Sequence, residues 1–217
     1  MANEDSFINE VSDEVRRERL YGYFRRYGWI AIAAILILVG GATFNEWRKA
    51  TAQAEAEALG DAVLGALDSD DPAARVEALS TLSAEGAGSA ILSMITAAEN
   101  VEAGDRDAAI TRIEAIAGNG TIDPLYRELA VLKLVQLRGD ALPPADRRAQ
   151  LEPLTAPGAP YRTLALELIA LSHVDEGETE AALSVLNDIL ADGETPQGLR
   201  RRASQLIVAL GGSLSAT

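Results

Sequence analysis

One long apolar run stands out from the mixed pattern of hydrophobic and polar positions near the start of the chain. The sixteen residues from Trp29 to Phe44, WIAIAAILILVGGATF, carry no charge. At about 1.5 Å of rise per residue the run covers roughly 24 Å, and Tyr27 and Trp47 extend it toward both faces of a bilayer. The pattern predicts a transmembrane helix over residues 28–47. A segment at 1–27 precedes it, and a second domain at 48–217 follows.

Aromatic residues flank this run on both sides. Tyr27 and Trp29 lie at one end and Phe44 and Trp47 at the other, where membrane helices concentrate aromatic rings at headgroup depth. A buried core helix would not need these two belts, and a lone Arg-Arg pair before the run is not a twin-arginine signal. A cleaved signal peptide stays an alternative, because the Gly-Gly-Ala stretch at 40–42 resembles a cleavage site. Six acidic residues, however, precede the run where a signal peptide has a short basic leader.

The positions of the basic residues predict the orientation of this helix. Five arginines precede the run, and only Arg48 and Lys49 follow it closely. The five are Arg16, Arg17, Arg19, Arg25 and Arg26. Because basic flanks remain on the cytoplasmic side, we expect a single-pass protein of the bacterial inner membrane with its N-terminus inside. The domain at 48–217 is then exported, to the periplasm in a Gram-negative cell.

The composition of the exported part restricts its fold and its partners. After residue 44 the chain carries 14 Lys or Arg against 27 Asp or Glu, a net charge of −13, which argues against binding to nucleic acid. Only Tyr126 and Tyr161 are aromatic beyond Trp47, so the core must consist of Leu, Ile, Val and Ala. Such a core favours closely packed helices over a β-sandwich, and the sequence predicts an all-α fold.

An internal repeat supports this prediction. When the chain is shifted by 73 residues, the segment from Ala97, AAENVEAGDRDAAITRIEAIA, aligns without gaps on the segment from Ala170, ALSHVDEGETEAALSVLNDIL. The alignment pairs Ala97 with Ala170, Val101 with Val174, Gly104 with Gly177, Ala109 with Ala182, Ile113 with Leu186, Ile116 with Ile189 and Ala130 with Ala203. The matched small and large residues indicate that one helix–turn–helix unit recurs.

The repeating unit is about half of this shift. Three prolines lie 36 residues apart, namely Pro124, Pro160 and Pro196, and three glycines lie at a similar spacing, namely Gly104, Gly139 and Gly177. Glycine provides the positive φ of a turn between helices, and proline is tolerated in the first turn of a helix. We therefore expect helix pairs with a glycine turn inside each pair and a proline-containing loop between pairs. An earlier pair turns at 68–72.

These repeats resemble the tetratricopeptide repeat (TPR) family. A period near 34 and small residues at the eighth and twentieth positions are its marks. Counting from Thr163, Ala170 and Ala182 occupy those two positions, whereas Leu166 and His173 stand where Trp and Tyr are usual. The resemblance implies a degenerate TPR-like α-solenoid. Arrays of this kind bind protein partners on the surface formed by the first helix of each pair.

The layout of the whole chain resembles a narrower family. The N-terminal SFINEVSDEVRRERLYGYFRRYGW, one span, the sequence EWRKA and degenerate repeats are similar to the periplasmic ancillary subunits of the bacterial SecYEG translocon. This resemblance implies a scaffold anchored in the lipid bilayer that accompanies the Sec translocon and periplasmic chaperones. The alternative is an accessory or assembly subunit of another inner-membrane complex, such as a respiratory complex.

The sequence offers no convincing catalytic, cofactor or metal site. His173 is the single histidine, and its counterpart across the repeat is Asn100, which indicates an ordinary polar helix position. A metal site needs several convergent ligands, and the acidic stretch at 68–71 lacks the glycine and distal glutamate of a calcium loop. Gly118-Asn119-Gly120 is typical of a turn. We therefore expect a binding protein, not an enzyme, without a cofactor.

Basic residues on the predicted first helices are the candidate partner-binding residues of the exported domain. They are Arg127, Lys133, Arg162, Arg200, Arg201 and Arg202. Their concentration in an acidic domain favours an acidic segment of a partner. The other interpretation is that they form ion pairs with neighbouring Glu and Asp on the protein's own surface.

Overall fold

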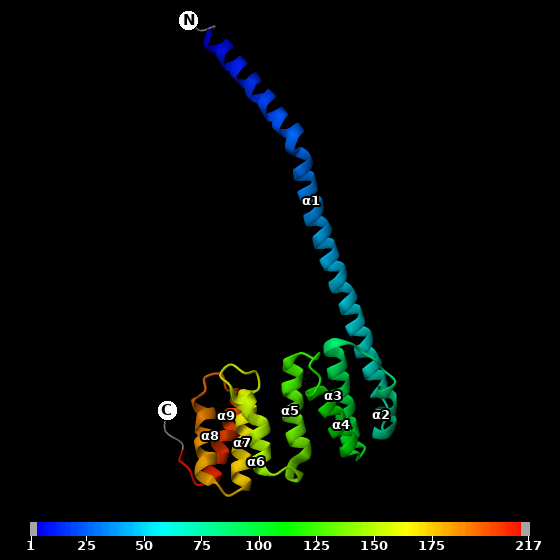
Figure 1. Ribbon diagram of the computed structural model, residues 1–217, viewed down its shortest axis with the longest axis vertical. Coiled ribbons are helices and arrows are strands. Elements are labelled where there is room, and N and C mark those ends of the chain that lie inside the picture. The colour runs from blue at the N-terminus through cyan, green and yellow to red at the C-terminus, as the bar shows by residue number, and fades with distance from the viewer. Residues whose placement is uncertain (1–3, 214–217) are drawn as a thin grey trace. The chain divides into compact units, whose positions relative to one another are not determined.

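The computed structural model describes the backbone of residues 4–213. Within this range it describes the side chains of residues 29, 30, 33, 34 and 36–213. Helices account for all regular structure in this range, which confirms the predicted all-α class. They are α1 (Glu4–Ala66), α2 (Pro72–Ser80), α3 (Gly86–Glu102), α4 (Arg106–Ala117), α5 (Pro124–Arg138), α6 (Pro144–Leu151), α7 (Arg162–Asp175), α8 (Thr179–Ala191) and α9 (Gln197–Ala209), with short 3₁₀ helices η1 (Gly139–Ala141) and η2 (Glu152–Thr155) (Figure 1).

Helix α1 is continuous over 63 residues and extends beyond both ends of the predicted span. The chain divides into two compact units, Met1–Ala58 and Leu59–Thr217, so their boundary lies inside this helix. Leu59 and Val63 are the first residues of α1 that join a hydrophobic core, with Leu79 and Leu92. The predicted domain boundary at 47/48 thus precedes the first packed residue by three helical turns, because residues 48–58 are exposed.

The predicted membrane span at 28–47 lies within α1. Among the residues whose side chains the structure describes, no helix has the length and apolar character needed to cross a membrane. Residues 28, 31, 32 and 35 of the predicted span lie outside that set. The side chains of the segment at 1–27, including the five arginines and Tyr27, also lie outside it.

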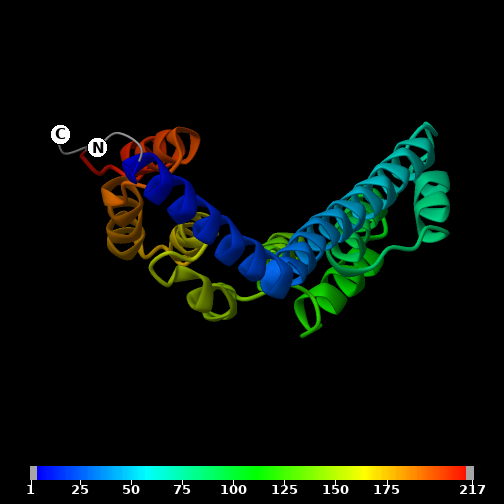
Figure 2. The same cartoon turned by 90° about the horizontal axis from the view of Figure 1, so that it is seen from above.

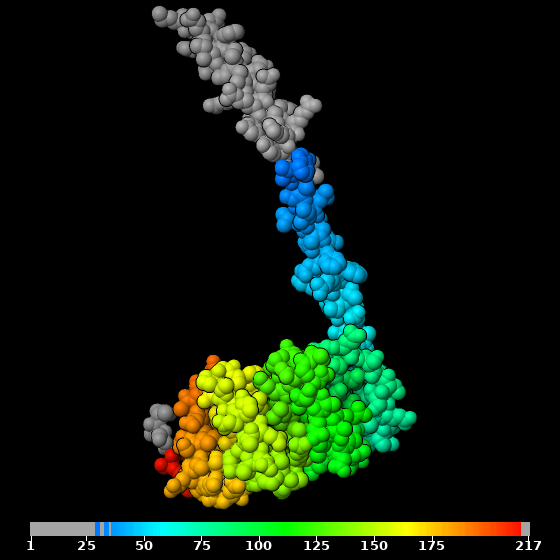
Figure 3. Space-filling view, viewed as in Figure 1, coloured from blue at the N-terminus to red at the C-terminus, as the bar shows by residue number. Residues whose placement is uncertain are grey.

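The second unit is an array in which each helix packs mainly on its neighbours in the sequence. Figures 1 and 2 show α2 to α9 following one another along this unit in chain order, and the space-filling view shows the same progression over one face (Figure 3). Over residues 59–213 its core consists of four successive clusters, which join α1–α2–α3, α3–α4–α5, α5–α6–α7 and α7–α8–α9. This arrangement of nearest-neighbour cores is typical of a repeat solenoid.

The glycine turns confirm the predicted helix pairs. Gly104 ends the turn between α3 and α4 with φ +83°, and Gly177 has φ +75° between α7 and α8. In both turns the glycine N–H donates to the carbonyl three residues earlier at 3.0 Å. The next N–H donates to the carbonyl five residues earlier, at 2.8 and 2.9 Å. The two turns therefore use the same local chemistry, because a residue with a side chain is disfavoured at positive φ.

The matched alanines explain why the helices of a pair approach closely. Ala97 and Ala109 are 2% and 0% exposed, and their counterparts Ala170 and Ala182 are both 0% exposed. The larger partners at the same register, such as Ile113 and its counterpart in α8, fill the centres of two different core clusters. The 73-residue repeat predicted from the sequence is therefore a repeat of packing.

The middle pair departs from the regular unit. Gly139 has the expected positive φ of +48°, but α6 is only eight residues long and is followed by η2. Prolines account for this shape, because Pro143 and Pro144 fix the start of α6 and Pro153 lies in η2, where it cannot continue the helix. Pro160 lies in the loop before α7, as predicted.

Candidate partner-binding groove

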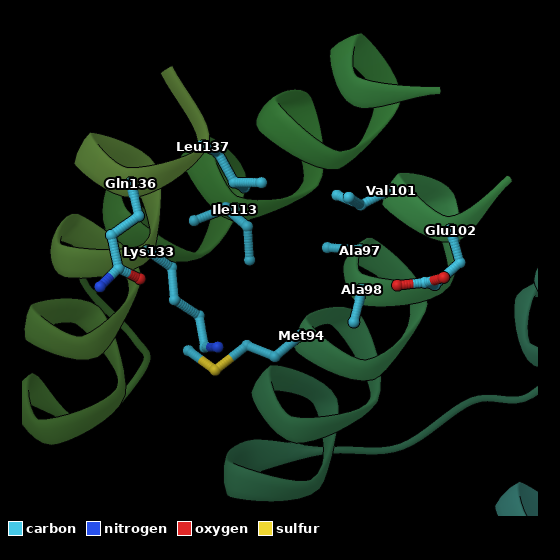
Figure 4. A pocket seen from close by; sticks show the side chains of 9 residues that line it. All are labelled: Met94, Ala97, Ala98, Val101, Glu102, Ile113, Lys133, Gln136 and Leu137. Atoms are coloured by element: carbon cyan, nitrogen blue, oxygen red, sulfur yellow. The ribbon is translucent and has the colours of Figure 1, made fainter. Parts of the chain in front are cut away.

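A pocket of about 270 Å³ lies between the first helices of two successive pairs, α3 and α5. Its lining residues come from α3, α4 and α5 (Figure 4), namely Met94, Ala97, Ala98, Val101, Glu102, Ile113, Lys133, Gln136 and Leu137. Buried Ile113 lies at its base in α4, whereas Ala98, Val101, Glu102 and Gln136 are exposed at the surface. The pocket is therefore an apolar depression with polar groups at its edge.

The local packing of α3, α4 and α5 creates this depression. Ala97, Ala109 and Ala130 are each at most 2% exposed, and they join one core cluster with Ile113. Small residues at these contacts let the three helices approach one another. On α3, Met94 lies one turn before Ala97 and is partly buried against this cluster, whereas Ala98, next to Ala97, is exposed.

Lys133 is the predicted partner-binding residue that the structure places in the pocket. Its side chain extends from α5 toward Met94, and Glu102 lies across the pocket on α3 (Figure 4). Within the described part of the chain, the Lys133 ammonium has no carboxylate within 4.0 Å and no hydrogen-bond partner. The pocket thus presents one positive and one negative group at separate positions.

Three of the predicted arginines contact groups of the protein itself. Arg162 donates to the Thr155 carbonyl at 3.0 Å and forms an ion pair with Asp192. Arg200 donates to two carbonyls near the C-terminal end of α8, at 3.1 and 2.8 Å. Arg202 forms a two-pronged ion pair with Glu167, at 2.7 and 2.8 Å. The ion pairs favour the second interpretation for Arg162 and Arg202. Arg200 is instead held by backbone carbonyls of the protein.

The two remaining predicted arginines lie away from the pocket lining. Arg201 is exposed on α9. Arg127 is partly buried on α5, where its Nε and the Glu128 Oε2 have no hydrogen-bond partner among the described residues. Tyr161 at the start of α7 is near this region. Its pKa is raised above 10.0 by burial and by the charges of Glu128 and Tyr126. Whether any of the six basic residues binds a partner stays a prediction.

His173 lies in the last turn of α7 and contacts the connection to α8. Its Nδ1 lies 2.6 Å from a carboxylate oxygen of Glu178, and its backbone carbonyl accepts the Glu178 N–H at 2.9 Å. In the first repeat the Asn100 carbonyl accepts the corresponding N–H of Asp105 at 2.8 Å. Among the described residues, no group of three or more His, Cys, Asp or Glu side chains is arranged to hold a metal ion.

The other polar motifs of the sequence form turns and helix caps. Asp71 accepts the Ala73 N–H at 3.0 Å and caps α2, directly before Pro72. Asn119 accepts the N–H and the hydroxyl of Thr121, at 3.0 and 2.8 Å. Both arrangements are the turn chemistry that the sequence predicted.

The described part of the predicted span is exposed. Leu36, Ile37 and Leu38 are 66%, 74% and 72% exposed, and Val39 is 58% exposed. The predicted interface residues Trp29, Phe44 and Trp47 are 67%, 58% and 63% exposed. The rings of Phe44 and Trp47 lie 6.1 Å apart with a 38° tilt. All of these exposed apolar residues belong to the first unit.

Sequence reasoning missed most of the pocket, although a signal was present. It selected basic residues and passed over Met94, Ala98 and Val101, which are apolar and occupy one side of α3. The 73-residue register pairs Ile91 with Leu164 and Ala98 with Leu171, so exposed apolar residues recur on the first helix of two pairs. A search for apolar positions outside the repeat's core register would have found them.

The comparison with protein families agrees with this geometry. A family model described as a tetratricopeptide repeat-like domain matches residues 22–167, about two thirds of the chain. Neither a curated protein nor a solved structure matches. Helices α8 and α9 lie beyond the matched residues, yet they repeat the packing of α4 and α5. From its helix pairs and this match, the chain belongs to the tetratricopeptide repeat-like domain family.

Proposed function

We propose that this protein is a membrane-anchored scaffold that binds other proteins during protein export, beside the Sec translocon and periplasmic chaperones. A TPR-like domain indicates a scaffold for protein–protein interactions, which is the coarser part of the proposal. The observation that carries it is the pocket between α3 and α5, because it offers an apolar depression on the first helices of two pairs. The proposal assigns binding, not catalysis, to this surface.

The sequence of the first unit supports the membrane anchor. Four consecutive aliphatic side chains at 36–39 are more than half exposed in α1, and contiguous exposed apolar surface in a soluble protein is rare. The Thr43 hydroxyl donates to the Val39 carbonyl at 2.8 Å, so the hydroxyl within the run has a partner in the same helix. Lipid would cover this surface if the helix crosses the bilayer at 28–47.

The orientation and the partner rest on other arguments. Five arginines before the run support a cytoplasmic N-terminus, and the net charge of −13 after residue 44 belongs to the exported domain. The Sec translocon is proposed because the layout of the whole chain resembles its ancillary subunits. The family model matches residues 22–167 and so includes the predicted span at 28–47 together with the repeats. This coverage supports the view that the anchor and the repeats occur together in the family.

Two experiments in intact cells test the proposal. A reporter that is active only outside the cytoplasm, fused after Thr217, should be active if the second unit is exported. A reporter active only in the cytoplasm would then be silent, and the reverse result would refute the topology. This first experiment concerns only the anchor and its orientation.

The second experiment identifies the partners. A photo-crosslinking residue placed at exposed Ala98 should capture export components from native membranes, whereas the same residue at exposed Ala191 on α8 serves as the control. Recovery of translocon subunits or periplasmic chaperones from position 98 alone supports the proposal. Reproducible recovery of a respiratory complex without export components would replace the Sec assignment by that alternative.

A further inference from the structure

We propose that the pocket between α3 and α5 binds an amphipathic helical segment of a partner protein, with a carboxylate on Lys133 and a basic group facing Glu102. This inference rests on the proposed scaffold function and specifies its ligand. Three observations carry it, namely the shape of the apolar surface, the state of the lysine and the separation of the two charges.

The apolar surface is larger than the pocket. A cavity of ~150 Å³ already holds a benzene-sized molecule, so about 270 Å³ accepts one large aliphatic or aromatic side chain. Ile91, 44% exposed, and Val101, 38% exposed, lie on α3 with Met94 and Ala98 between them at helical spacing. From Ile91 to Val101 the stripe covers ten residue steps along the helix and is roughly 15 Å long. A helix of similar length, with apolar residues at every third or fourth position, would cover it.

The state of Lys133 indicates the charge of the ligand. It is the single lysine of the second unit, partly buried in the pocket, and it has no ion-pair partner within 4.0 Å among the described residues. Nearby Arg138 differs, because it pairs with Glu114. An unpaired ammonium on an apolar surface gains from a carboxylate supplied by a ligand.

The position of Glu102 indicates that the ligand carries a basic group as well as an acidic one. Its carboxylate lies on the far side of the pocket from Lys133, with Ala97 and Ala98 between them (Figure 4). A ligand with acidic groups at both ends would meet this carboxylate unfavourably, in a domain that already carries an excess of negative charge. The same excess disfavours a second copy of the chain as the occupant. The complementary ligand therefore carries an acid, an apolar anchor and a base in that order.

Synthetic peptides and the full-length protein in detergent micelles test this inference. The reference peptide has sixteen residues on an alanine–glutamine background, three leucines at helical spacing, a glutamate at one end and an arginine at the other. A second peptide replaces the glutamate by lysine, and a third replaces the central leucine by serine. Fluorescence anisotropy measures the dissociation constants, and empty micelles give the blank.

The wild-type protein should prefer the glutamate peptide to the lysine peptide, by about fivefold for one partly exposed charge pair. The serine peptide should bind at least about tenfold more weakly, because one leucine leaves its buried position. Lys133→Met should lose the preference for glutamate, and Lys133→Glu should reverse it. Lys49→Met removes the only other lysine and should leave the dissociation constants of the glutamate and lysine peptides unchanged.

Several results would overturn the inference. One is a Lys133→Glu protein that melts like the wild type and still prefers the glutamate peptide. Another is equal binding of the leucine and serine peptides, which would show adhesion by charge alone. If the Lys133 variants fail to fold, the three dissociation constants of the wild-type protein still test the inference. A wild-type protein that does not prefer the glutamate peptide to the lysine and serine peptides would overturn it.

The membrane crosslinking experiment separates this inference from the proposed function. If Lys133→Glu captures the same export components at position 98 as the wild type, the scaffold function stands and the pocket chemistry is wrong. If no partner is captured but the peptide preference reverses, the pocket chemistry stands and the export function is wrong. Capture of a second copy of the chain at position 98 would contradict the assigned ligand.

Discussion

Replacing Ala109 by leucine tests the packing that defines the repeat. This alanine is 0% exposed in α4 and joins the core cluster of α3, α4 and α5. Its counterpart in the second repeat, Ala182, is also 0% exposed. Leucine adds three carbon atoms at a site where two helices meet without free surface, so either the side chain leaves its preferred rotamer or the helices separate.

The magnitude follows from two opposing effects. Burying three more carbons would contribute about 0.8 kcal/mol each if space were present. No exposed area remains at Ala109, so steric strain outweighs this gain, and overpacked cores typically lose about 1–3 kcal/mol. For a chain of this size each kcal/mol lowers the melting temperature by roughly 2–4 °C. We expect Ala109→Leu and Ala182→Leu each to lower it by roughly 2–12 °C.

The matched control is Ala115→Leu in the same helix. Ala115 is exposed, and leucine is nearly as favourable as alanine in a helix, so its effect should stay within about 0.5 kcal/mol. Circular dichroism at 222 nm during heating gives the melting temperature, and urea titration gives the midpoint of unfolding. A wild-type midpoint for Ala109→Leu, or equal losses for Ala109→Leu and Ala115→Leu, would refute the assigned helix interface.

Four further substitutions address glycine conformation, a helix end and the pH dependence. Gly177→Ala should destabilise the domain by about 1–2 kcal/mol, because the φ of +75° at this position is unfavourable for a residue with a side chain. Gly60→Ala should instead stabilise α1 by up to about 1 kcal/mol, because an added Cβ meets no atom within 4 Å and alanine favours the helix. The midpoints of urea unfolding compare the two variants. Arg200→Met removes two hydrogen bonds to carbonyls near the end of α8 and should cost about 1–3 kcal/mol in the same assay, and no loss would show that water replaces the guanidinium. The raised pKa of Tyr161 means that folding favours its protonated form, so this contribution is complete below pH 10 and is lost as the pH rises through the folded-state pKa. Tyr161→Phe should therefore weaken the alkaline loss of stability, and identical alkaline melting profiles would contradict that assignment.

The middle pair and the arginines show where sequence reasoning reached its limit. The glycine spacing predicted a turn at Gly139, but not that α6 would stop after eight residues, because its length depends on packing between α5 and α7 as well as on its prolines. Similarly, the sequence could not separate a partner-binding arginine from a structural one. Arg162 pairs with Asp192, and Arg202 pairs with Glu167, thirty and thirty-five residues away.

The sequence by itself determined the features that depend on a few neighbouring residues. The turns at Gly104 and Gly177, the cap at Asp71 and the buried alanines of the 73-residue repeat all follow from local backbone chemistry or from a periodic pattern. Only the tertiary structure decided that Lys133 shares a pocket with Met94 and Glu102. Lys133 lies more than thirty positions from either residue, and it meets them because α3 and α5 pack around the same buried side chains of α4.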